Sequence, residues 1–457
     1  MGVGRAWHRA GLRLGQSPNP LGVLPTLALP ALLAVLIVAW TLTSASAARA
    51  ATGAAQEGHP ALPAGLARAV RRAFGPETLF PRQTELRARG GRDGDTFGAE
   101  LALNSSGTIA LIGAYHPYPL SGPDRFSGVA YVFARSGSRW IQQAELRARD
   151  ARGGDSFGGS VALNSSGTIA LVGAQGKNYA TGAVYVFTRS GSRWTQRAEL
   201  TARGGADAFG QAVALNASGS TALIGAFGAS TGSMTGASFV FTGSGSRWTQ
   251  RAVLTASNGA SNDGFGEVVA LDALGTTALV AAPNLNGGTG AAYVFTGSGS
   301  AWTQQAELTA GDAAPGDLFG SVALSASGTT ALIGAPGKDG ATGAVYVFTR
   351  SGSSWTQQAE ITARDAASND AFGIAVALTT SGGTALIGAD GNRGGRGTAY
   401  VFTRSGSKWT QRTEIAARNG ADGDFFGSAV VLSAFGKTAL VGAMNANRST
   451  GAAYVFT

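Results

Sequence analysis

The residues best suited to chemistry or recognition gather in one segment, residues 115–127. It holds the only histidine beyond position 59, with three aromatic rings and an adjacent acid and base: Tyr115, His116, Tyr118, Asp124, Arg125 and Phe126. Aromatic rings with a few polar groups are the usual chemistry of ligand recognition. We therefore treat these six residues as ligand-binding candidates. The alternative is an insertion that only packs its rings onto the fold.

Little else in the sequence suits catalysis. The chain has no cysteine, which excludes a thiolate nucleophile and cysteine-bound metal. It also lacks a glycine-rich phosphate loop and carboxylates at metal-ligand spacing. We expect no catalytic residue, no cofactor and no metal. The alternative is a polysaccharide-active enzyme with acid–base groups in the same segment, namely His116, Asp124 and either Tyr115 or Tyr118.

A repeated pattern surrounds this segment and must position it. The motif Asp-x-Phe-Gly occurs seven times at intervals of 52–60 residues, a period typical of propeller blades. We interpret it as structural, because Asp caps tight turns, Phe packs between repeats and Gly permits close backbone approach. Its residues are Asp95, Phe97 and Gly98; Asp155, Phe157 and Gly158; Asp207, Phe209 and Gly210; Asp263, Phe265 and Gly266; Asp317, Phe319 and Gly320; Asp370, Phe372 and Gly373; and Asp424, Phe426 and Gly427.

Each repeat is expected to form four strands. In the second repeat, short apolar or alternating runs are separated by turn residues, and residues 175–181 form a loop. The strands are predicted at residues 158–163, 168–174, 183–188 and 194–202. The sequence thus predicts an all-β fold over residues 78–457, a seven-bladed β-propeller of four-stranded antiparallel blades. Because the last repeat lacks a fourth strand, we expect residues 80–86, which align with residues 140–146, to complete it.

The N-terminal residues indicate export. Basic residues precede an apolar run at residues 21–42, and small residues follow it, so residues 1–47 are predicted to be a signal peptide. An uncleaved membrane anchor is the alternative. Residues 48–77 are rich in Ala, Pro and Gly and are expected to be a linker or pro-segment. The predicted location is secreted or cell surface.

The repeat resembles a known family. Phe-Gly at its head, Gly334-Ala335-Pro336 after the second strand and a following Gly-Ala-x-Tyr-Val-Phe are similar to the FG-GAP repeat of the integrin alpha propeller. The resemblance implies the seven-bladed fold. Calcium-binding repeats of that family carry several carboxylates between the first two strands, whereas the turns here offer at most one, such as Asp272. We therefore expect no calcium sites.

Alternating strand direction gives the propeller two different faces. The turns between strands 1 and 2 and between strands 3 and 4 are nearly identical, and we interpret their scattered basic residues as solvated. Acceptor sequences for N-glycosylation occur at Asn104, Asn164 and Asn216 in these turns and at Asn447 elsewhere. Sugars there would block this face. The loops on the other face vary, and residues 115–127 form the longest.

Net charge argues against nucleic acid as a partner. Of the formal charge of +9, +5 precedes residue 81, so the repeats carry only a mild excess. We expect an exported, monomeric, non-catalytic binding or adhesion module that recognises protein or glycan. It would contact a membrane only through an uncleaved N-terminal segment. The alternatives are the enzyme above and a structural component of a surface layer.

Overall fold

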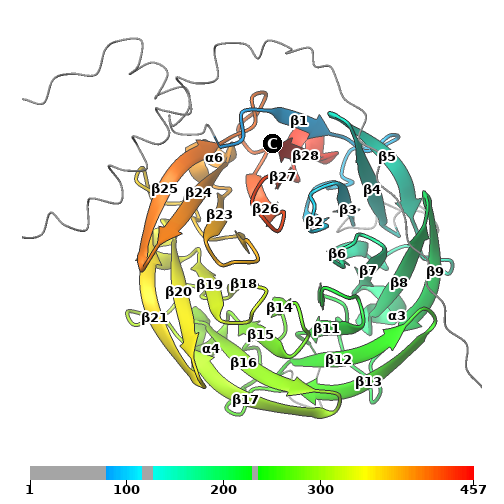
Figure 1. The fold of residues 1–457 in the computed structure, drawn as a ribbon, viewed down its shortest axis with the longest axis horizontal. Helices are drawn as coiled ribbons and strands as arrows, with labels where there is room; N and C mark the ends of the chain where they lie inside the picture. The colour runs from blue at the N-terminus through cyan, green and yellow to red at the C-terminus, as the bar shows by residue number, and fades with distance from the viewer. Residues whose placement is uncertain (1–78, 116–126, 229–234) are drawn as a thin grey trace, which may run out of the picture. The chain divides into compact units, whose positions relative to one another are not determined.

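The computed structural model describes residues 79–115, 127–228 and 235–457. Within these residues, 28 strands form seven four-stranded antiparallel sheets, which confirms the predicted all-β seven-bladed propeller. Figure 1 shows the sheets arranged around a common axis, with the first strand of each blade innermost and the fourth outermost. The prediction for residues 1–47 and 48–77 lies outside the described residues and stays a prediction.

The blades are numbered in chain order. Blade 1 contains β2 (Glu100–Leu103), β3 (Ile109–Ala114), β4 (Val129–Ser136) and β5 (Arg139–Leu146). Blade 2 contains β6 (Phe157–Leu163), β7 (Ile169–Ala174), β8 (Ala183–Ser190) and β9 (Arg193–Leu200). Blade 3 contains β10 (Ala212–Leu215), β11 (Thr221–Ala226), β12 (Ala237–Ser244) and β13 (Arg247–Leu254). Blade 4 contains β14 (Val269–Leu271), β15 (Thr277–Ala282), β16 (Ala291–Ser298) and β17 (Ala301–Leu308).

Blade 5 contains β18 (Ser321–Leu324), β19 (Thr330–Ala335), β20 (Ala344–Ser351) and β21 (Ser354–Ile361). Blade 6 contains β22 (Val376–Leu378), β23 (Thr384–Ala389), β24 (Thr398–Ser405) and β25 (Lys408–Ile415). Blade 7 contains β26 (Phe426–Leu432), β27 (Ala439–Ala443), β28 (Ala452–Phe456) and, from the other end of the chain, β1 (Gln83–Leu86). In the part of the chain that the structure describes, single-turn helices follow the second strands of five blades: α3 (Lys177–Ala180), α4 (Leu285–Gly288), α5 (Lys338–Ala341), α6 (Asn392–Gly395) and α7 (Ala446–Ser449).

The hydrophobic core lies between neighbouring blades. Second and third strands are apolar at consecutive positions because both of their faces are covered, and all six residues of β3 are buried. The motif phenylalanine fills the space between two blades: Phe157 is fully buried among side chains of blades 1 and 2. Its ring centroid lies 5.6 Å from that of Tyr185 and 6.1 Å from that of Phe187. Burial of such a ring contributes about 2–3 kcal/mol.

The motif glycine lets two blades approach along their backbones. Gly158 has a φ of +93°, which favours glycine. A Cβ atom on Gly113, in the second strand of the preceding blade, would lie only 2.1 Å from the carbonyl oxygen of Gly158. Both glycines are therefore required by packing between blades 1 and 2.

Strand β1 pairs antiparallel with β28, with Gln83 opposite Phe456 and Leu86 opposite Ala453. The Gln83 side chain accepts a hydrogen bond from the backbone N–H of Arg418 at 3.3 Å, as Gln142 accepts one from Arg89 at 2.7 Å. Gln83 therefore occupies the position that Gln142 has in blade 1, whereas the sequence alignment pairs it with Gln143. The difference of one residue arises because β5 contains a bulge and β1 does not. Equivalent bonds join Arg149 to Gln196, Arg203 to Gln250, Ser257 to Gln304, Gly311 to Gln357 and Arg364 to Gln411.

We call the end of the propeller that carries the 1–2 turns and the 3–4 hairpins the turn face, and the end that carries the 2–3 and 4–1 loops the loop face. A closed ring of backbone hydrogen bonds joins the seven 1–2 turns. The bond from Ser105 N–H to the Ser165 carbonyl begins it, and the bond from Ala434 N–H to the Ser105 carbonyl closes it. The intermediate members are Ala217, Ala273, Ala326 and Thr380.

The three acceptor asparagines of the turn face are buried, so the folded turns leave no room for a sugar on them. Asn104, Asn164 and Asn216 are each 3–4% exposed. The Oδ1 atom of Asn104 accepts the N–H groups of Thr108 and Ile109 at 2.8 and 2.9 Å, and its Nδ2 atom donates to Ser106. The side-chain amide of Asn104 is therefore fully engaged in hydrogen bonds within its own turn. Asn447, on the loop face, is exposed.

Candidate functional site

A cavity of about 410 Å³ lies around the propeller axis and opens on the loop face. Its wall is formed by the first residues of the inner strands, and its mouth by loop residues. The lining includes Glu100, Glu267, Val322, Val376, Val430 and Pro336. Apart from Pro336, which follows β19, these residues directly follow the Phe-Gly pair or lie a few positions beyond it, and the inner strands surround the axis in Figure 1. Closure of the ring thus brings residues from five blades into one cavity.

Carboxyl groups make the cavity chemically distinctive. Burial raises the pKa of Glu100 to about 8, so this carboxyl group holds its proton at neutral pH. Among the described residues, the Glu100 carboxyl group has no hydrogen-bond or ion-pair partner. Burial also raises the pKa of Glu267. Glu100 therefore offers the cavity a protonated carboxyl group that can both donate and accept hydrogen bonds.

Exposed apolar side chains lie at the cavity mouth. Leu318 and Ile374 line it and are 40% and 37% exposed. Phe227, 41% exposed, lines a second hollow that shares Glu267 and Asn284 with the axial cavity. We call Phe227, Leu318 and Ile374 the apolar rim. Exposed apolar groups beside a cavity are typical of binding sites.

Sequence reasoning missed this cavity, although a signal was present. The residue directly after the second strand is of six types in the seven blades: Tyr115, Gln175, Phe227, Pro283, Pro336, Asp390 and Met444. By comparison, all six 3–4 hairpins of the turn face contain Ser-Gly-Ser, and all seven 1–2 turns have glycine at their fourth position. Variation at a single position of a repeat marks the place where the blades are not interchangeable.

Of the six ligand-binding candidates, the structure describes one. Tyr115 occupies the same repeat position as Pro283 and Pro336, which line the cavity, and a Cβ atom on Gly159 would lie 3.8 Å from its ring. His116, Tyr118, Asp124, Arg125 and Phe126 lie outside the described residues, so their role stays a prediction. At the far end of the segment, the Ser127 carbonyl accepts the Phe157 N–H at 2.8 Å. The segment therefore begins beside Gly159 and ends at the junction of blades 1 and 2.

The motif aspartates hold the 4–1 loops in shape. The Asp95 carboxylate accepts the backbone N–H of Arg92, three residues earlier, at 2.6 Å. Asp155 accepts the N–H of Arg152 in the same way. The same bond, at 2.6–2.9 Å, is made by Asp263, Asp317, Asp370 and Asp424. These carboxylates are committed to the backbone.

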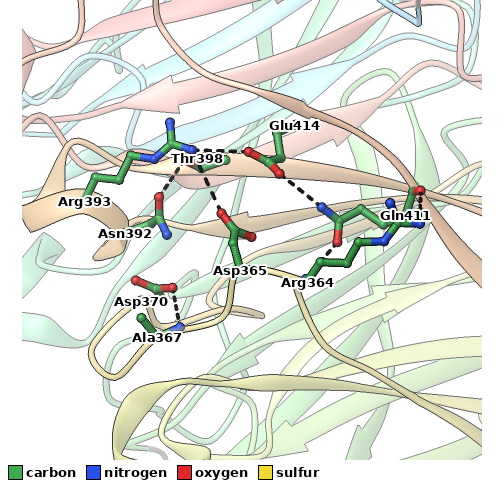
Figure 2. Close-up of polar contacts among 9 residues, drawn as sticks. All are labelled: Arg364, Asp365, Ala367, Asp370, Asn392, Arg393, Thr398, Gln411 and Glu414. Carbon is green, nitrogen blue, oxygen red and sulfur yellow. Dashed lines mark hydrogen bonds and ion pairs between the residues drawn. The ribbon is translucent and has the colours of Figure 1, made fainter.

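Charged clusters on the loop face join neighbouring blades. Figure 2 shows the cluster at the junction of blades 5 and 6, where Arg393 lies 3.2 Å from Glu414 and 3.9 Å from Asp365. Gln411 accepts the Arg364 N–H at 3.0 Å and donates to Glu414 at 3.3 Å. The arrangement therefore fixes the loop between the two blades.

The part of the chain that the structure describes contains no group of three or more His, Cys, Asp or Glu side chains placed to hold a metal ion. Nor do these residues include a helix with the length and apolarity needed to cross a membrane. The absence of metal sites remains a prediction from the turn sequences.

Comparison with known families matches the FG-GAP repeat in six segments, which together cover more than half of the chain: residues 140–187, 194–241, 248–295, 302–348, 355–402 and 409–456. No curated protein matches the chain. Each matched segment begins at the outer strand of one blade and ends in the third strand of the next. One sequence repeat therefore spans two blades: it supplies the outer strand of one blade and the first three strands of the next.

Proposed function

Because this chain belongs to the FG-GAP repeat family, we propose that it is an exported, non-catalytic module that binds a protein or glycan through its loop face. One observation carries the proposal: the residue after the second strand, at the level of the cavity mouth, is of six types in seven blades, whereas all six 3–4 hairpins of the opposite face contain Ser-Gly-Ser. Ligands bind where a rigid scaffold presents variable loops. Its N-terminal residues support export.

The apolar rim favours a protein over a glycan. Leu318 and Ile374 are aliphatic, and aliphatic side chains bury apolar side chains of a protein ligand. The protonated Glu100 carboxyl deeper in the cavity can bond a backbone amide or a polar side chain without the cost of burying a charge. Glycan binding by stacking would rest on Phe227 and on the tyrosines of residues 115–127.

The proposal is tested on an array of matrix proteins and glycans. The full chain is compared with a variant that carries Phe227→Ser and Ile374→Ser, and with a variant whose residues 115–127 are replaced by residues 175–181. Ile141→Thr is the matched control: Ile141 is 47% exposed on β5, and threonine holds this position in blades 2 to 6. We expect the first two variants to lose binding and the control to keep it.

Equal binding by all four proteins would show that the loop face is not the site. Turnover of a polysaccharide that is lost in His116→Ala, with binding retained, would instead support the enzyme. Self-association that is the same in the full chain and in every variant would support a structural role in a surface layer.

A further inference from the structure

The fold separates charges that are mixed in the sequence. The seven 1–2 turns and six 3–4 hairpins of the turn face contain nine basic residues and one acidic residue, Asp272. The basic residues are Arg135, Arg139, Arg189, Arg193, Arg247, Arg350, Arg404, Lys408 and Lys437. The other described acidic residues lie in the loops of the opposite face or in the strand ends that adjoin them. The turn face is therefore strongly cationic although the repeats as a whole carry little net charge.

The one acid on this face is not available to neutralise it. Asp272 is 2% exposed, and its carboxylate accepts the N–H groups of Thr276 and Thr277 at 2.7 and 3.0 Å. Within the described residues, none of the nine basic side chains forms an ion pair. Several of the arginines bond only a backbone carbonyl of their own hairpin, as Arg404 bonds that of Gly406.

Two large apolar side chains project from the same face. Leu274 and Phe435, in the 1–2 turns of blades 4 and 7, are 75% and 81% exposed. The other five turns carry serine at this position: Ser106, Ser166, Ser218, Ser327 and Ser381. The turn itself therefore does not require an apolar residue there.

The apolar tips are held rigidly. The closed ring of backbone hydrogen bonds passes through Ala273 and Ala434, the residues directly before Leu274 and Phe435. The 1–2 turns that carry both residues join the two inner strands of a blade, nearer the propeller axis than the hairpins between the two outer strands (Figure 1). A preformed surface loses little conformational entropy on docking.

We propose that the turn face docks onto the surface of an anionic lipid bilayer. Leu274 and Phe435 enter the interfacial region, and the ring of arginines and lysines lies over the headgroups. Apolar side chains inside a basic surface are the combination that binds anionic membranes, with contributions from both buried apolar area and charge. A nucleic acid or another soluble polyanion would neutralise the arginines but leave both apolar tips in water. This interpretation replaces the expectation of merely solvated turns.

Docking by the turn face would leave the loop face directed away from the membrane. The two proposals rest on opposite ends of the propeller and can fail independently. Membrane docking needs no residue of the axial cavity.

A position-specific probe tests the proposal on the full chain. Because the chain has no cysteine, Phe435→Cys can carry a single environment-sensitive fluorophore. The control is Tyr179→Cys, at a fully exposed position on the loop face. Vesicles of phosphatidylcholine with phosphatidylglycerol should shift the emission at position 435 to the blue and leave position 179 unchanged. Vesicles of phosphatidylcholine alone, or high salt, should abolish the shift.

Vesicle co-sedimentation separates the two contributions. Leu274→Ser with Phe435→Ser installs the serine of the other turns, and Arg404→Gly with Lys408→Ala installs the uncharged hairpin of blade 4. Since a basic residue near an anionic surface contributes about fivefold to partitioning, the hairpin variant, which lacks two of them, should bind about 25-fold more weakly. Arg418→Ala with Arg448→Ala removes the same charge from the loop face and should have little effect. Every variant shares the same N-terminal segment, so its contribution cancels.

The proposal is overturned if the label at position 435 does not respond to anionic vesicles, or if position 179 responds equally. It is also overturned if the loop-face charge variant loses as much binding as the hairpin variant. Binding of duplex DNA that is unchanged by the two serine substitutions, without a vesicle response, would identify a polyanion site instead.

Discussion

The Nζ atom of Lys338 lies 2.6 Å from Oδ2 of Asp312, although Lys338 belongs to α5 of blade 5 and Asp312 to the loop that arrives from blade 4. Tyr346 donates to the other carboxylate oxygen at 2.7 Å. The hydrogen bond from Lys338 lowers the pKa of Asp312, and the same bond raises the pKa of Lys338. At the corresponding places in blade 4, Leu285 is buried and Tyr293 donates to Asn258 at 3.0 Å. The chain thus contains a charged and a neutral version of one junction.

We predict that Asp312→Asn alone lowers the free energy of unfolding by about 2 kcal/mol, because the mostly buried Lys338 ammonium loses its carboxylate. Asp312→Asn combined with Lys338→Leu reproduces the neutral junction of blade 4 and should cost less than the single substitution. Urea unfolding of the three proteins measures this. A double variant that is less stable than Asp312→Asn alone would contradict the prediction.

Replacement of Gly334 by alanine should cost about 3 kcal/mol, because its Cβ atom would lie 2.0 Å from the Gly373 carbonyl oxygen. Gly352→Ala is the control: this hairpin glycine has a φ of +63° and open space around it, so only about 1 kcal/mol of backbone strain is expected. Thermal unfolding ranks the two variants. Equal losses would show that contact between blades is not what selects Gly334.

Blade 4 indicates how this contact can be relieved. Ala281 takes the place of Gly334 there, and Gly320 of the next blade is the one motif glycine without a positive φ. The segment after Gly320 is also one residue shorter than in the other blades. We therefore predict that Ala281→Gly changes stability by less than about 1 kcal/mol, the entropic cost of the glycine.

Glu100 should make the protein less stable as the pH rises. Its pKa is about 8 when folded and 4.5 ordinarily, so between these values the folded state keeps a proton that the unfolded state releases. The free energy of unfolding then falls by up to about 1.4 kcal/mol per pH unit across this window and levels off above it. Glu100→Gln should remove this slope. Urea unfolding over the window tests the sign, and identical slopes in both proteins would contradict it.

Removal of calcium should leave the melting temperature unchanged. The 1–2 turns supply one carboxylate in all, Asp272, and it is already bonded to two backbone N–H groups. A hard cation needs six to eight oxygen ligands, several of them charged. Thermal scans with a chelator and with added calcium measure the effect. A fall of several degrees on chelation would show that a site exists.

The sequence by itself determined the architecture. The spacing of Asp-x-Phe-Gly gave seven units, and runs such as residues 183–188 identified strands covered on both faces. These features depend on short stretches of sequence. The pattern of apolar residues along a strand shows which of its faces are buried, and a close approach of two backbones requires glycine at one position. The same reasoning placed a loop at residues 175–181, where the structure has the single turn α3 with left-handed Asn178 and Tyr179.

Only the tertiary structure decided which residues from different blades share an environment. Glu100 and Glu267 are far apart in the chain and meet in one cavity because the ring closes around the axis. Asn104 reads as an exposed acceptor site but is buried by its own turn and its neighbours. Basic hairpins that are mixed with acidic loops along the sequence are sorted to one face, because every blade reverses its strand direction in the same order. Composition records the sum of these charges, and the fold alone determines their separation.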